Sequence, residues 1–104
     1  MRGMGNMGNM MQQMQKLQKD MEKTQKELEA SVYRATDTNQ LVTVKVNGKR
    51  EILELTIDEA LVDPDDIDML QDLVIATINE ALAQVDQATQ DKMGRFTKGL
   101  NLPF

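Results

Sequence analysis

The chain has 104 residues, with 12 Lys and Arg against 17 Asp and Glu, for a formal net charge of −5. It contains no Cys and no His, which excludes disulfides, the usual zinc and iron–sulfur ligand sets, and nucleophilic catalysis that relies on a His base. One Tyr and two Phe are its only aromatic residues, too few for a base-stacking surface. This composition predicts no enzyme activity, no cofactor and no bound metal.

Charge is distributed unevenly along the chain. Residues 1–50 carry nine basic and five acidic residues, residues 51–91 carry twelve acidic residues and no basic one, and residues 92–104 carry three basic residues and no acidic one. If the two basic ends meet in space, they give a local positive field on an acidic protein. No apolar run approaches the ~20 residues of a membrane span, so we expect a cytoplasmic protein without a membrane partner.

The first element expected is a long helix. Residues 1–9 are rich in Gly, Asn and Met and predict a flexible N-terminal arm, followed by a single domain over residues 10–104. From Met10 onward, apolar residues recur at alternating spacings of three and four, which is typical of a helix with one narrow apolar seam. The seam comprises Met7, Met10, Met14, Leu17, Met21 and Leu28, with Thr24 in register. We expect this helix to project as an arm or to pair with another helix, and we favour an interface within a homodimer.

Three strands are expected next, over residues 31–37, 41–46 and 52–57. Val occupies every second position of the second strand, and Asn47-Gly48 is a strong signal for a tight hairpin turn. The pattern predicts an antiparallel meander with one apolar face. The second and third strands contribute the following inward-facing residues to the core and dimer interface: Val42, Val44, Val46, Leu53, Leu55 and Ile57.

A second long helix is expected to begin at Asp63, which would cap its first turn, with Pro64 in the first helical position. Gly94 is a typical helix stop. The segment from Arg95 to Phe104 is too apolar for a free tail, so we expect it to dock on a surface that the sequence does not identify. The helix is expected to cover the sheet, and its residues in the core and dimer interface are Leu70, Leu73, Val74 and Ile78.

The acidic residues before and within the first turn of this helix invite comparison with a calcium site. An EF-hand loop counted from Asp63 needs Gly at its sixth position and a bidentate Glu at its twelfth. Asp68 and Val74 occupy these positions. Helix capping is therefore the preferred explanation of the acidic cluster.

Two groups of basic residues are candidates for binding an anion. Lys16, Lys19, Lys23 and Lys26 are spaced by three, four and three residues, so they form one ridge along the first helix. Such a ridge is either a solvated face supported by neighbouring carboxylates or a row of cations that follows phosphates. The second group, Lys92, Arg95 and Lys98, lies near the end of the second helix. Together they favour binding to a nucleic-acid backbone with weak sequence preference.

Two segments resemble a known family. The run Asp63-Pro-Asp-Asp-Ile-Asp-Met-Leu-Gln-Asp-Leu-Val-Ile-Ala-Thr-Ile-Asn79 resembles the most characteristic segment of the YbaB/EbfC family of bacterial nucleoid-associated proteins, and residues 93–103 resemble its closing segment. The Met/Gln/Lys-rich first helix and the segment from Val42 to Gly48 fit as well.

The resemblance implies an α+β fold with a long N-terminal helix, a three-stranded antiparallel meander and a long C-terminal helix. It further implies a tweezer-like homodimer that binds double-stranded DNA with its protruding helices in the cytoplasm and nucleoid, and recombination or replication proteins as further partners. The cations that match the family's protruding helices are Lys16, Lys19, Lys23, Lys26, Lys92 and Arg95.

Two functional hypotheses follow. The first is a dimeric DNA-binding protein that clamps the duplex backbone between helical arms. The alternative is an adaptor or chaperone-like clamp that holds a partner helix along the Met-rich seam. Salt separates them, because phosphate contacts weaken steeply with salt and apolar contacts do not.

Overall fold

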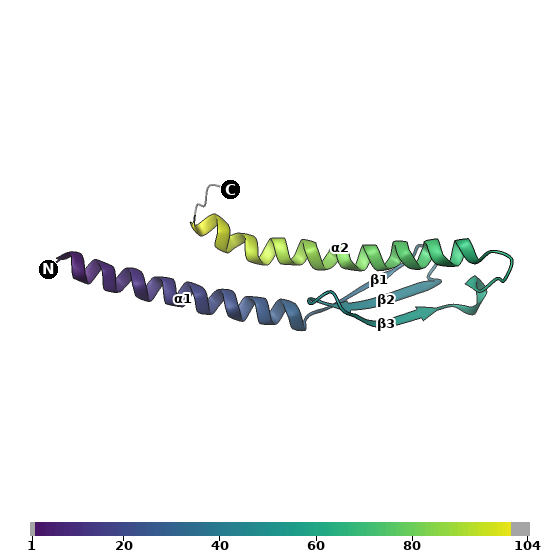
Figure 1. Cartoon of the computed structure of the whole chain (residues 1–104), viewed down its shortest axis with the longest axis horizontal. Helices are drawn as coiled ribbons and strands as arrows, with labels where there is room; N and C mark the ends of the chain where they lie inside the picture. Colours follow the sequence, from purple (N-terminus) through teal and green to yellow (C-terminus); the bar gives the residue numbers. More distant parts are fainter. Residues whose placement is uncertain (1, 101–104) are drawn as a thin grey trace.

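In the computed structural model, residues 2–100 are described, with side chains for residues 8–94 and Phe96 (Figure 1). The elements are α1 (Arg2–Ala30), β1 (Val32–Thr36), β2 (Val42–Asn47), β3 (Ile52–Ile57), the short 3-10 helix η1 (Glu59–Leu61) and α2 (Ile67–Leu100). This order confirms the predicted α+β fold of helix, meander and helix. Within the described part of the chain, no helix is long and apolar enough to cross a membrane.

The core lies between the sheet and α2. The strands are antiparallel in the order β1-β2-β3, and Val44 of the central strand lies opposite Ala35 and Leu55. Because residues directly opposite one another share a face of the sheet, these three side chains point to the same side. Val42, Val44 and Val46 are completely buried there, together with Ala81 and Val85 of α2. The expected alternation of β2 is therefore confirmed.

Strand β3 departs from the expected burial. Ile57 is half-buried against the core, but Leu53 is 53% exposed and Leu55 is 43% exposed. Helix α2 packs mainly on β1 and β2, so among the described residues the middle and start of the apolar side of β3 remain exposed. Leu55 lies on the core side of the sheet, as predicted, but Leu53 and Leu55 are not buried within the single chain as we expected. Four residues of α2 are half-buried against the core, as expected: Leu70, Leu73, Val74 and Ile78.

Helix α2 begins at Ile67, after the Asp63 where we expected it. Residues 63–66 form a turn in which the Asp66 amide donates to the Asp63 carbonyl at 3.0 Å. The Asp66 carboxylate then accepts from the Met69 amide at 3.2 Å, so Asp66 is the residue that caps the helix. Pro64 occupies the second position of the turn, which Pro also favours.

Helix α2 ends later, and helix α1 begins earlier, than the glycines in the sequence led us to expect. Helix α2 runs through Gly94 to Leu100, and Phe96 beyond this glycine is only 7% exposed, so packing outweighs the weak helix propensity of glycine. Helix α1 begins at Arg2, eight residues before the expected Met10, because extending a formed helix costs little. The flexibility expected of residues 1–9 stays a prediction.

The apolar seam of α1 pairs with α2 of the same chain. Thr24 and Leu28 are buried, Leu17 and Met21 are half-buried, and Met14 is exposed. Figure 1 shows the two helices side by side and antiparallel, both extending beyond the same end of the sheet. The seam thus forms a two-helix arm within one chain, where we had favoured an interface between two chains.

The turn between β1 and β2 is closed by Asp37. Its carboxylate accepts from the Val42 amide at 2.6 Å and from the Asn39 amide at 3.0 Å. Partial desolvation raises the pKa of this carboxyl, but the backbone donors, Val42 first among them, outweigh that effect and hold the pKa below its ordinary value. Asp37 therefore serves the turn, and its charge fixes where β2 begins.

Candidate nucleic-acid interface

The structure brings four of the predicted cations together on one face of α1. Lys16, Lys19, Lys23 and Lys26 are all exposed, and we call this row the lysine ridge. Lys19 lies nine residues before the buried Leu28, which places it about 180° around the helix from that residue. The lysine ridge therefore faces away from α2, along the outer side of the two-helix arm.

The lysines of the ridge are not engaged in ion pairs. Among the side chains that the structure describes, the two ion pairs join Lys45 to Glu54 at 3.2 Å and Arg50 to Asp86. Neither pair involves the ridge, so its ammonium groups are available to an external anion.

Carboxylates flank the ridge on both sides. At 100° per residue, Glu22 and Glu29 lie along one edge of the row, and Asp20 and Glu27 lie along the other. The positive stripe is consequently narrow. A narrow stripe suits a thin line of anions, such as a phosphate backbone, better than a broad acidic protein surface.

The second basic group is separate from the ridge. Lys92 is exposed and lies seven residues after Val85 and four before Phe96, two buried residues on one stripe of α2. Lys92 therefore lies on the side of α2 that faces α1, whereas the ridge lies on the far side of α1. The side chains of Arg95 and Lys98, which we also predicted to bind DNA, lie outside the described residues.

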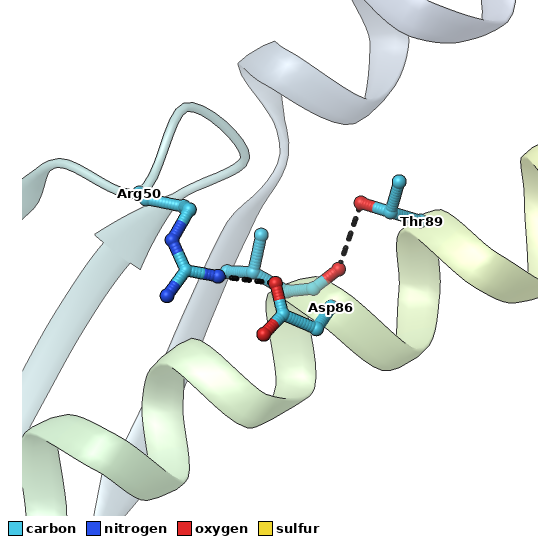
Figure 2. A network of polar contacts seen from close by, with 4 residues as sticks. Arg50, Asp86 and Thr89 are labelled. Atoms are coloured by element: carbon cyan, nitrogen blue, oxygen red, sulfur yellow. Dashed lines mark hydrogen bonds and ion pairs between the residues drawn. The ribbon is translucent and has the colours of Figure 1, made fainter.

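The root of the arm is held by the hairpin between β2 and β3. The Gly48 amide donates to the Ser31 carbonyl at 3.1 Å, which ties the hairpin tip to the end of α1. On the other side, Arg50 donates to Asp86 of α2, and the neighbouring Thr89 hydroxyl donates to the Val85 carbonyl at 2.8 Å (Figure 2). Sequence reasoning identified the Asn47-Gly48 turn but missed its role in joining the two helices.

A second surface feature is apolar and lies at the opposite end of the molecule. Ile57, Leu70, Val74 and Ile75 line a shallow hollow together with two polar residues of α2. The exposed Leu55 lies on the same face of β3 as Ile57. We call this area the β3–α2 surface, and it comprises Leu53, Leu55, Ile57, Leu70, Val74 and Ile75. Contiguous exposed apolar area of this kind marks interaction sites.

The acidic cluster serves local structure. The Asp58 carboxylate accepts from the Ala60 amide at 2.9 Å and the Asp63 carboxylate from the Asp65 amide at 2.9 Å. In the part of the chain that the structure describes, acidic side chains form no group of three or more that could hold a metal ion.

Comparison with known proteins identifies the family to which the chain belongs. The model of the YbaB/EbfC DNA-binding family matches residues 4–100. The chain belongs to this family. A nucleoid-associated protein of Exiguobacterium sp. (strain ATCC BAA-1283 / AT1b) is 59% identical over 103 residues, covering 99% of this chain and 98% of the relative. The nucleoid-associated protein of Oceanobacillus iheyensis is 56% identical, covering 95% of each chain.

The fold of this YbaB/EbfC family member has a counterpart among solved structures. The crystal structure of an uncharacterized protein from Helicobacter pylori superposes with a TM-score of 0.62 at 18% identity, covering 75% of this chain and 90% of the other. At this identity the likeness concerns the fold alone. The helix–meander–helix arrangement is thus a known one for a chain of this kind.

Proposed function

We propose that this chain forms a homodimer that binds duplex DNA through its phosphate backbone, with low sequence specificity, in the bacterial nucleoid. The observation that carries the proposal is the lysine ridge, an unpaired row of cations on a projecting arm. Membership of a DNA-binding family and relatives named nucleoid-associated proteins support DNA as the ligand and the cytoplasmic nucleoid as the location.

The dimensions of the ridge suit this ligand. Ten residues separate Lys16 from Lys26, which corresponds to about 15 Å along the helix. Duplex DNA presents roughly nine phosphates over that length of its axis. Four ammonium groups in a row can therefore each meet a phosphate without reading a base, which accounts for low specificity.

The clamp requires two chains. Within one chain the lysine ridge faces away from α2, so α1 and α2 do not hold DNA between them. We infer that a homodimer presents two arms and that the duplex lies between them, against the ridge of each. Lys92, Arg95 and Lys98 would add further positive charge along the arms.

The dimer interface that we propose is the β3–α2 surface. It lies at the other end of the molecule from the free ends of the helices (Figure 1), so pairing there leaves both arms unobstructed. β3 is also an edge strand, whose free backbone groups a second copy can pair or cover. The exposed Leu53 and Leu55 would then become buried, in agreement with their predicted place at a dimer interface.

A substitution in β3 tests this interface. We expect Leu55→Asp to convert the dimer to a monomer, because a carboxylate would have to be desolvated at the centre of an apolar contact. Analytical ultracentrifugation measures the change. The matched control is Thr56→Asp, which adds the same charge on the opposite face of the strand, and it should stay dimeric. If Leu55→Asp stays dimeric at the same concentrations, the interface lies elsewhere.

The DNA-binding proposal is tested with two duplexes of equal length and unrelated sequence. Their dissociation constants should agree within a few fold, since a backbone contact carries no sequence information. Specific DNA binders favour their own site by typically 10³-fold or more, and a preference of that size would contradict the proposal.

The adaptor hypothesis requires an accessible Met-rich seam on α1, and α2 of the same chain covers most of that seam. Residues 17–28 of the seam are covered to differing degrees by α2 of the same chain. A partner helix would have to displace α2 or use the short exposed stretch around Met10 and Met14. The four lysines of the ridge, in contrast, are all exposed.

A further inference from the structure

The free half of α1 carries an apolar hollow. Met11, Met14, Leu17 and Met21, with two glutamines, line a depression of about 360 Å³. Met11 is 61% exposed and Met14 is 67% exposed. Exposing a row of apolar side chains to water costs free energy. We therefore expect another apolar segment to cover the hollow.

The end of α2 lies close to this hollow. Gln25 and Leu28 of α1 line a hollow together with Thr89 and Met93 of α2, which fixes the pairing of the antiparallel helices. Moving seven residues outward along both helices brings Leu100, the last residue of α2, level with Gln18 of α1. Figure 1 agrees, since α2 ends beside the middle of α1, and among the described residues 2–100 no helix lies beside the first half of α1.

The four residues that follow α2 have the length and chemistry to fill the hollow. Residues 101–104 read Asn-Leu-Pro-Phe and span up to about 14 Å when extended, equal to about nine helical residues of α1. They therefore reach from the level of Gln18 past Met11. Pro favours an extended backbone at the residue before it, and in an extended segment Leu102 and Phe104, two positions apart, would lie on the same side.

We propose that residues 101–104 dock along α1 of the same chain, with Leu102 and Phe104 over the hollow between Met11 and Met21. Thioether side chains adapt to irregular surfaces and make favourable contacts with aromatic rings, which suits Phe104. The docked segment joins the end of α2 to the first half of α1 and shields the exposed methionines. The lysine ridge on the far side of α1 is left free, and the proposal does not depend on DNA binding.

Disulfide trapping in the full chain tests the docking. The protein has no Cys, so the pair Met14→Cys with Leu102→Cys gives a single possible intrachain bond. The matched control is Gln12→Cys with Leu102→Cys, because Gln12 lies about 160° around the helix from Met14. In a glutathione redox buffer, an undocked segment would reach both positions with similar effective concentration.

We expect the Met14 pair to form its intrachain disulfide at least about tenfold more favourably than the Gln12 pair. Non-reducing electrophoresis separates this product from a crosslinked dimer. Equal trapping of both pairs would overturn the docking. Crosslinks found only between chains would overturn the intrachain assignment and give the hollow to a second copy.

Methionine methyl NMR provides a readout that needs no crosslink. Phe104→Asp in the full chain should shift the methyl resonances of Met11 and Met14, because a ring and its contact are removed. The methyl of Met69, which is exposed on α2 far from the hollow, should not move. Unchanged Met11 and Met14 resonances would contradict the docking.

Discussion

Replacing Lys16, Lys19 and Lys23 together by Gln is expected to weaken duplex binding strongly and to make it less sensitive to salt. Each lysine that neutralises a phosphate adds about 0.9 to the slope of log affinity against log salt. The triple variant should therefore lose about 2.7 from this slope per bound chain. Fluorescence anisotropy of a labelled duplex at several salt concentrations measures both quantities.

The matched control removes the same charge elsewhere. Arg34, Lys45 and Lys49 lie on the sheet and its hairpin, away from the outer face of α1, and their replacement by Gln also takes the net charge from −5 three units lower. The exposed Lys45–Glu54 pair contributes little to stability. We expect the control variant to keep the slope of the parent. Equal weakening by both triples would show that overall charge, and not the ridge, governs binding.

Gly48→Ala is expected to destabilise the protein by about 3 kcal/mol, near the upper end for an overpacked site. A Cβ at this position would lie 1.7 Å from the Leu28 carbonyl oxygen and 2.4 Å from its carbonyl carbon. Both atoms are backbone at the end of α1, so a side chain cannot rotate away to make room. The hairpin tip would have to leave α1, and its hydrogen bond to Ser31 would be lost.

Gly94→Ala is the matched control for this substitution. A Cβ there meets nothing within 4 Å, and alanine in a helix interior is favoured over glycine by about 1 kcal/mol. Chemical denaturation should therefore show opposite changes in the free energy of unfolding for the two variants. A Gly48→Ala variant as stable as the parent would contradict the close approach of the hairpin to α1.

The elements that the sequence predicted well are those in which local pattern and packing agree. The alternation of Val42, Val44 and Val46 predicts one buried face of β2, and that prediction holds because α2 packs on this face. The periodic spacing of the lysines likewise places them on one face of a helix without any tertiary information. Helix limits were less predictable, because the burial of Phe96 outweighs the stop signal of Gly94.

The sequence pattern could not predict which helix packs against which strand or helix. The exposure of Leu53 and Leu55 depends on α2 lying over β1 and β2, and both leucines look inward-facing in the sequence. The pairing of the α1 seam with α2 of the same chain, and the separation of Lys92 from the lysine ridge, follow from the direction in which α2 leaves the sheet. The Arg50–Asp86 contact joins residues 36 positions apart, and no local signal marks it.

The most direct test of the account is the salt dependence of DNA binding by the unmodified chain. Anisotropy of a labelled duplex is measured between about 50 and 200 mM salt. If four lysines per chain contact phosphates, log affinity should fall linearly with log salt, with a slope of about −3.6 for each chain bound, and equally for unrelated sequences. Absence of binding at the lowest salt, or binding that salt leaves unchanged, would contradict a backbone clamp built on the lysine ridge.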